Sequence, residues 1–148
     1  MQHGGEAKNT VGAISRAAQA AYEREEFVKG VPVHRLCTSA IPVPARVPSA
    51  KRYAPSPAPG VDFQSGTASA GWTCLRFGMS NPMYYQYHYQ QGSGWVVPSG
   101  APGPDGFEAA AVGDIDGDGV KSTFARTGKV SGGALMLSTN LYIDNEFE

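Results

Sequence analysis

The stretch GGEAKNTVGAISRAAQAAYERE, residues 4–25, decides the fold, because it carries a long helical pattern close to the start of the sequence. Apolar side chains recur there in steps of three and four residues, at Ala7, Val11, Ile14, Ala18, Ala21 and Tyr22. The opposite face is polar, and the alanines favour helix strongly. The pattern therefore predicts an amphipathic helix from Glu6 to about Phe27, which Gly30 and Pro32 would end.

The bulk composition limits the classes of partner. A chain of 148 residues suits one domain with a real core. The net charge of −1 gives no electrostatic basis for binding nucleic acid, so no nucleic-acid partner is expected. No apolar stretch of this sequence approaches the ~20 residues that span a bilayer.

The clearest strand is MYYQYHYQ, residues 83–90, which alternates with a period of two. Its apolar face, which we expect to pack against the helix, consists of Met83, Tyr85, Tyr87 and Tyr89. Tyr84, His88 and Trp95 are expected on the outer face. Further strand-like segments occupy 95–97, 106–114, 121–130, 134–137 and 141–143. A helix followed by strands predicts an α+β fold, with the N-terminal helix packed on an antiparallel sheet of about four strands.

The expected organisation is a single domain over 1–148, divided into a tail, a helix, a Pro-rich loop and a sheet region, over 1–4, 5–29, 30–71 and 72–148. The Pro-rich loop holds seven of the 11 prolines. Proline lacks an amide donor, so neither helix nor central strand should persist there. We expect a long wandering connection, with short edge-strand pieces near Val31–His34 or Arg46–Val47 and a single helical turn near Trp72.

Two cysteines, Cys37 and Cys74, flank most of the Pro-rich loop. They suit one disulfide in an oxidising compartment. Such a disulfide would stabilise the fold by about 3–4 kcal/mol, because it closes a loop in the unfolded chain. The alternative is a pair of buried free thiols.

The sharpest local motif is DIDGDG, residues 114–119. Carboxylates at Asp114, Asp116 and Asp118 could converge on Ca²⁺, completed by backbone carbonyls or Ser122. An EF-hand is excluded, because the twelfth position of the loop is Ala125 rather than glutamate. The alternative is that the Asp-Gly pairs only form turns between two strands. No other cofactor is expected.

Other clusters give weaker signals. A zinc quartet of His34, Cys37, Cys74 and His88 matches no compact zinc module. No nucleophile elbow or Cys–His arrangement is present, so no enzyme is predicted. The acidic pairs are expected to be solvated charge, at Glu25, Glu26, Glu146 and Glu148.

A small basic and aromatic cluster lies within the Pro-rich loop, at Arg46, Lys51, Arg52 and Tyr53. We interpret it as solvated surface that is available for contact with a partner, rather than as a nucleic-acid patch.

Several segments together resemble one family. Residues 6–14 and 20–23 resemble the helix that follows the hydrophobic stem of type IV pilins and pseudopilins. The segments GDIDGDGVKSTF and YIDNEFE, at 113–124 and 142–148, look like the C-terminal sheet of pilin-like proteins from deltaproteobacteria. The middle segments 84–87 and 104–107 are similar to such proteins as well.

The resemblance implies a structural role without catalysis. The chain would be the headgroup of a longer protein, whose apolar stem and prepilin peptidase site are missing from this sequence. Subunits would assemble through the N-terminal helix into a type IV pilus or a type II secretion pseudopilus. The full-length form would be anchored in the inner membrane before it reaches the periplasm or cell surface. Calcium at a β-loop is known for some pseudopilins. The alternatives are a stand-alone extracellular adhesin-like module and a small hydrolase.

Overall fold

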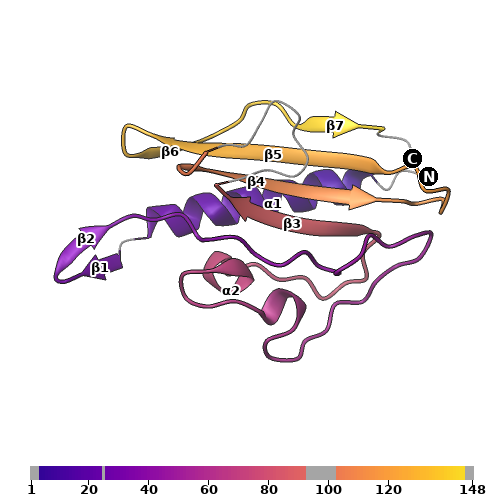
Figure 1. The fold of residues 1–148 in the computed structure, drawn as a ribbon, viewed down its shortest axis with the longest axis horizontal. Helices are drawn as coiled ribbons and strands as arrows, with labels where there is room; N and C mark the ends of the chain where they lie inside the picture. The colour runs from indigo at the N-terminus through magenta and orange to yellow at the C-terminus, as the bar shows by residue number, and fades with distance from the viewer. Residues whose placement is uncertain (1–3, 25, 93–102, 146–148) are drawn as a thin grey trace.

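The computed structural model describes residues 4–24, 26–92 and 103–145. It is an α+β fold with an N-terminal helix that lies across one face of an antiparallel sheet (Figure 1). The elements are, in chain order, α1 (Gly4–Glu23), β1 (Glu26–Val28), β2 (Val31–Val33), a 3-10 turn η1 (Asp62–Gln64), α2 (Gly71–Leu75), β3 (Tyr85–Gln91), β4 (Gly106–Gly113), β5 (Ser122–Ser131), β6 (Ala134–Leu137) and β7 (Tyr142–Asp144). Within the described residues, no helix has the length and apolar character that crossing a membrane requires.

The helix ends earlier than the sequence predicts. α1 stops at Glu23, and the expected last turns to Phe27 and beyond are instead a β-hairpin of β1 and β2. Gly30 and Pro32, which were expected to end the helix, lie in this hairpin. Its two-residue loop, Lys29 and Gly30, has φ angles of 52° and 79°. Two residues with positive φ match the tight hairpin turn whose twist suits adjacent strands, and the flanking valines favour strand.

The main sheet has five described strands rather than about four. Its order is β3-β4-β5-β6, and β7 pairs with β5 as well. β6 pairs with the end of β5 from Gly128 onward, whereas β7 pairs near its start, at Thr123–Ala125. The long β5 thus pairs with both short final strands, at different positions along its length. The expected strand at 95–97 lies outside the described residues, as do Glu25, Glu146 and Glu148.

The aromatic face of β3 forms the core, as predicted. Met83, Tyr85, Tyr87 and Tyr89 are all fully buried. Small and branched side chains of α1 pack in the same core, among them Ala7, Val11, Ile14 and Ala18. The Tyr87 hydroxyl donates a hydrogen bond to the carboxylate of Glu6 on α1, which ties the helix to the sheet.

The outer face of β3 is covered rather than open to solvent. His88 lies on the face opposite α1, where it was expected, but it is fully buried, and Tyr84 is half-buried. Trp95 lies outside the described residues. The sheet therefore buries polar side chains on the face opposite α1, which alternation alone does not reveal.

The Pro-rich loop is not a wandering connection. It runs along the edge of the sheet beside β3, where Val43 bridges Tyr87 and Tyr53 bridges Met83. Isolated bridges replace a continuous ladder, because prolines cannot donate the missing hydrogen bonds. The bridges do not fall at Arg46–Val47, where an edge piece was considered. The strand piece near Val31 and the helical turn near Trp72 are confirmed as β2 and α2.

Burial of tyrosines predicts alkaline sensitivity. Burial raises the pKa of the Tyr87 and Tyr89 phenols above their ordinary value of 10.0. The unfolded chain releases these protons near pH ~10 while the folded chain keeps them. The free energy of unfolding should therefore fall above about pH 10, by up to about 1.4 kcal/mol per pH unit for each tyrosine. Urea unfolding across this range measures the effect.

The matched control is Tyr89→Phe, which removes one of these titrating groups together with its 2.8 Å hydrogen bond to the Cys37 carbonyl. The variant should be less stable at neutral pH but lose less stability above about pH 10. Identical pH dependence in both proteins would contradict the assignment.

Candidate functional site

The acidic motif forms the turn between β4 and β5. Asp114 follows the last residue of β4, and Asp116 and Asp118 lie further along the exposed turn. Each of the three carboxylates offers an oxygen within 4.8 Å of the others. Gly117 and Gly119 have φ angles of 74° and 85°, which side-chain-bearing residues adopt at a cost. The sequence prediction that the three carboxylates can converge is thus met by the geometry.

Asp114 differs from its two neighbours, because only 6 % of it is exposed. Its Oδ2 atom accepts hydrogen bonds from the Gly119 amide at 3.1 Å and the Ser49 hydroxyl at 3.3 Å. Its Oδ1 atom is buried and has no hydrogen-bond partner. Its backbone carbonyl accepts the Ala50 amide at 2.9 Å. The buried carboxylate therefore joins the Pro-rich loop to the β4–β5 turn.

Ser49 is the member of this cluster that sequence reasoning missed. It is 65 residues away in the chain, and only the bridge between Ser49 and Asp114 brings the two segments together. Ser122, considered as a further ligand, pairs with Gly113 in the register of β4 and β5. Gly113 also pairs with Tyr85, so Ser122 lies on the sheet face that packs on α1. That placement takes it away from the acidic turn.

The predicted basic cluster surrounds a surface hollow. Arg46, Lys51, Arg52 and Tyr53 all line a depression of about 670 Å³ in the Pro-rich loop, with Pro44, Ala45, Val47, Pro48, Ser49 and Asp62. The three basic side chains are exposed. The Tyr53 hydroxyl donates a 2.7 Å hydrogen bond to Asp62, which raises the pKa of this phenol. The hollow thus combines an apolar lining with a basic rim.

A buried histidine and carboxylate meet on the sheet face opposite α1. The Nε2 atom of His88 lies 2.9 Å from Oε1 of Glu108, and their side chains are 1 % and 0 % exposed. The two side chains belong to the neighbouring strands β3 and β4. Their contact is diagonal, because Gln90 rather than His88 stands directly opposite Glu108 in the register. Sequence reasoning missed it, because Glu108 stands in a weakly alternating strand with no motif. Its burial keeps solvent-borne substrates from the imidazole.

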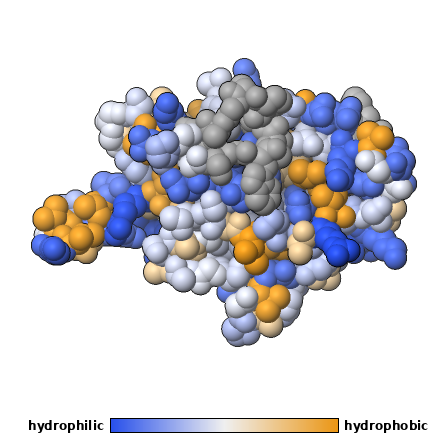
Figure 2. Space-filling model, viewed as in Figure 1, coloured by the Kyte–Doolittle hydropathy of each residue, from blue (hydrophilic) through white to orange (hydrophobic). Residues whose placement is uncertain are grey.

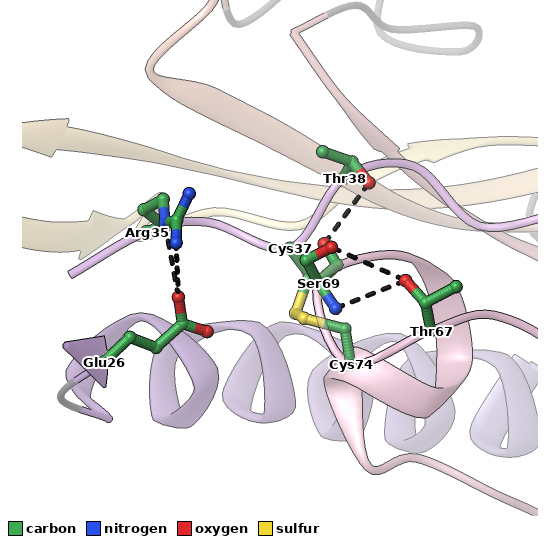
Figure 3. A network of polar contacts seen from close by, with 7 residues as sticks. All are labelled: Glu26, Arg35, Cys37, Thr38, Thr67, Ser69 and Cys74. Carbon is green, nitrogen blue, oxygen red and sulfur yellow. Dashed lines mark hydrogen bonds and ion pairs between the residues drawn. A yellow bond between two sulfur atoms is a disulfide. The ribbon is translucent and has the colours of Figure 1, made fainter. Parts of the chain in front are cut away.

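The two cysteines form a disulfide, as predicted, with their Cα atoms 5.8 Å apart. Backbone contacts beside the bond hold the same two segments. The Thr38 amide donates to the Ser69 carbonyl at 3.1 Å, and the Thr38 carbonyl accepts the Gly71 amide at 3.0 Å. Figure 3 shows the disulfide beside Thr38, whose hydroxyl also donates to the Ser69 carbonyl at 3.3 Å, together with the Arg35–Glu26 ion pair at 3.0 Å. The bond fastens α2 to the segment that follows β2.

The zinc quartet does not assemble. Both of its cysteines are consumed by the disulfide. His34 lies 2.9 Å from the Tyr22 carbonyl through Nδ1, and His88 contacts Glu108. Within the described part of the chain, the acidic turn is the one group of three or more metal-ligating side chains that converge.

Comparisons with known proteins give no family assignment: no family model, no curated protein and no solved structure matches this chain.

Proposed function

We propose that this chain is the globular head of a filament subunit of the type IV pilus or type II secretion pseudopilus kind. In the full-length protein an apolar segment would precede α1, anchor the subunit in the inner membrane, and later pack in the filament core. The support is the order of elements, a helix close to the start of the sequence laid across one face of an antiparallel sheet. No catalytic step is part of this proposal.

The observation that carries the proposal is an apolar projection at one end of the molecule. The β1–β2 hairpin protrudes beyond the sheet, and hydrophobic side chains gather on it (Figures 1 and 2). Phe27, Val28 and Val31 are 69 %, 42 % and 58 % exposed. A contiguous exposed apolar patch on a protruding element marks an interaction site.

The hollow in the Pro-rich loop lies at the opposite end. Ser49, on its lining, bridges Asp114 just beyond the end of β4, and β4 points away from the hairpin (Figure 1). A projection at one end and a hollow at the other allow identical copies to join head to tail. Such a heterologous contact propagates into an open filament when its rotation does not close a ring. We therefore propose a second copy of this chain as the partner of the hairpin.

The outward face of α1 suits contact with neighbouring subunits too. Its exposed side chains include the short Asn9 and Ala20 together with Arg16. Small residues such as Ala20 allow another helix to approach closely, and the charged Lys8 and Glu23 are exposed on α1 as well. The disulfide fits a location outside the reducing cytosol, in the periplasm or at the cell surface.

The proposal predicts that Phe27→Asp reduces filament assembly. The side chain is largely exposed, so the change should leave the free energy of unfolding of the isolated domain within about 0.5 kcal/mol. A buried charge at the contact should nevertheless lower the amount of filament strongly, by roughly tenfold or more. Cells producing the full-length variant would be sheared, and the filament fraction quantified with an antibody to the domain.

Met136→Asp is the matched control, because Met136 is also exposed, at 63 %, but lies on β6 rather than on the hairpin or the hollow. It should assemble normally. Equal assembly of the Phe27→Asp variant and the unaltered protein would remove the hairpin from the proposed contact.

A second candidate function is a stand-alone extracellular binding module. The basic-rimmed hollow is the observation that favours it. This alternative predicts that the isolated domain binds glycans or cell surfaces, and that Arg52→Ala weakens this binding. A filament subunit needs no such binding.

A further inference from the structure

A second, smaller pocket lies between α1 and the main sheet. It has a volume of about 340 Å³, and three segments line it: α1, β5 and the connection between β6 and β7. The lining residues are Lys8, Asn9, Gly12, Arg16, Arg126, Thr139 and Leu141. We propose that this α1–β5 pocket binds a phosphate group, carried either by a phospholipid headgroup or by a small soluble molecule.

The lining of the α1–β5 pocket is basic, although the chain as a whole is not. The lining contains one lysine and two arginines and no aspartate or glutamate, whereas the net charge of the whole sequence is −1. Within the part of the chain that the structure describes, no carboxylate forms an ion pair with Arg16 or Arg126. Two guanidinium groups at one pocket without a counter-charge attract an anion.

Arg16 reaches the pocket because Gly12 has no side chain. A Cβ atom at Gly12 would lie only 3.1 Å from Nη1 of Arg16 and 3.9 Å from its Cζ atom. The guanidinium of Arg16 therefore lies back along α1, over the turn that precedes its own Cα atom. Gly12 thus leaves room for an exposed guanidinium at the pocket.

Arg126 approaches the same pocket from the sheet. It stands two residues beyond the buried Phe124 on β5, so it lies on the sheet face that packs on α1. Its Nε atom donates a 2.9 Å hydrogen bond to the Ser138 carbonyl, which fixes the orientation of the guanidinium. Neither of its Nη atoms donates a hydrogen bond to another described residue. These terminal nitrogens are therefore available to a ligand.

The donors around the pocket select the chemistry of the ligand. Guanidinium groups bind oxyanions through forked pairs of hydrogen bonds, and Asn9 and Thr139 add an amide and a hydroxyl donor. Donors from three segments match the tetrahedral oxygens of a phosphate better than the planar pair of a carboxylate. Pockets of roughly 300–1,000 Å³ hold small organic ligands, so there is room for the group that carries the phosphate.

The phosphate site does not depend on the hairpin or the hollow, since neither contributes a lining residue. A lipid headgroup as the source of the phosphate rests on the proposed membrane anchor, because only an anchored chain stays close to a lipid surface. A soluble phosphate compound as the source does not rest on it. The two sources present the same chemistry to Arg16 and Arg126.

The test is a titration of the ¹⁵N-labelled intact chain with glycerol 3-phosphate, followed by NMR. We expect the Gly12 amide signal and the Nε–H signals of Arg16 and Arg126 to shift together. The dissociation constant should be on the order of 10⁻⁴–10⁻³ M, which a few charge-assisted hydrogen bonds can provide. Sodium acetate at the same ionic strength should bind more weakly.

Vesicles distinguish the two sources of phosphate. Phosphatidylglycerol vesicles present an anionic headgroup, whereas phosphatidylcholine vesicles carry the same phosphate beside a compensating positive charge. Sedimentation of the chain with phosphatidylglycerol vesicles, and not with phosphatidylcholine vesicles, identifies a lipid headgroup as the ligand. NMR shifts with glycerol 3-phosphate, without sedimentation on either kind of vesicle, identify a soluble phosphate compound.

Two variants assign the binding to this pocket. Arg16→Gln alters an exposed side chain and should fold normally. It should weaken binding by roughly tenfold or more, the loss expected for one hydrogen bond to a charged group. Arg126→Gln should weaken binding similarly, and urea unfolding shows whether this half-buried variant is folded.

The matched control is Arg52→Gln, which removes the same charge from an exposed arginine outside the pocket. It should bind glycerol 3-phosphate and vesicles like the unaltered protein, because the proposed site is local.

The proposal is overturned by either of two results. One is the absence of NMR shifts up to about 10 mM glycerol 3-phosphate, above the weakest expected dissociation constant, together with no sedimentation on phosphatidylglycerol. The other is binding that Arg16→Gln retains in full. Neither result bears on whether the chain assembles into filaments, and a failure of filament assembly would leave the pocket and its ligand unaffected.

Discussion

Replacing His88 with alanine is expected to destabilise the fold by about 3–5 kcal/mol. The change removes the group that lies 2.9 Å from the Glu108 carboxyl and leaves this acid buried at 0 % exposure without its histidine neighbour. It also opens a cavity in a part of the sheet where Ala110 and Ala125 are fully buried. A loss of this size is a large fraction of the stability of a typical domain. Urea unfolding followed by circular dichroism measures it.

The control is the double variant His88→Leu with Glu108→Leu. Replacing both partners by apolar groups of similar size removes both members of the buried pair, so it should cost less than either single alanine change. Glu108→Ala alone should resemble His88→Ala. If the double leucine variant instead lost as much as both single losses together, the two residues would not act as a pair.

Removal of the disulfide is the second large expected effect. The variant Cys37→Ala with Cys74→Ala should lose about 2–5 kcal/mol, because the bond joins residues 37 positions apart and restricts the unfolded chain. The loss should appear as a lower urea midpoint with little change in the native circular dichroism spectrum. The Thr38–Ser69 hydrogen bond at 3.1 Å remains to hold the same segments in the folded state.

Reduction provides the matching control for this variant. The unaltered protein in reductant should unfold at nearly the same urea concentration as the alanine variant. Intact mass should show the native protein lighter than its reduced form by two hydrogen atoms. Native protein with two free thiols, or a variant as stable as the oxidised protein, would contradict the assignment.

Periodicity correctly predicted those features of the fold that depend on one face of a single helix or strand. The aromatic alternation of β3 correctly predicted that Tyr85, Tyr87 and Tyr89 form the core, and the spacing of small residues correctly predicted which face of α1 they meet. The predicted end of α1 was wrong. The strand preference around Phe27 and the Lys29–Gly30 turn favour a hairpin there over continuation of the helix. Signals for helix and for strand overlap there, and only the pairing of β1 with β2 in the folded chain shows which of them prevails.

The candidate site, too, could be predicted only in part from the sequence. The three aspartates stand within five residues, so the sequence alone predicted that they can converge. Ser49 and the His88–Glu108 pair could not be predicted, because each contact joins segments that the fold, not the sequence, makes adjacent. Neither partner belongs to a local motif. The deep burial of Asp114 likewise depends on how the Pro-rich loop docks.

The proposal that the chain is the head of a filament subunit is tested most directly by locating the protein on cells that produce it. Filaments sheared from the surface would be labelled with an antibody raised against the folded domain and examined by electron microscopy. We expect label along the filaments, and its loss when the gene is deleted. Filaments that remain unlabelled, with the protein recovered inside the cell and Cys37 and Cys74 reduced, would contradict the proposal.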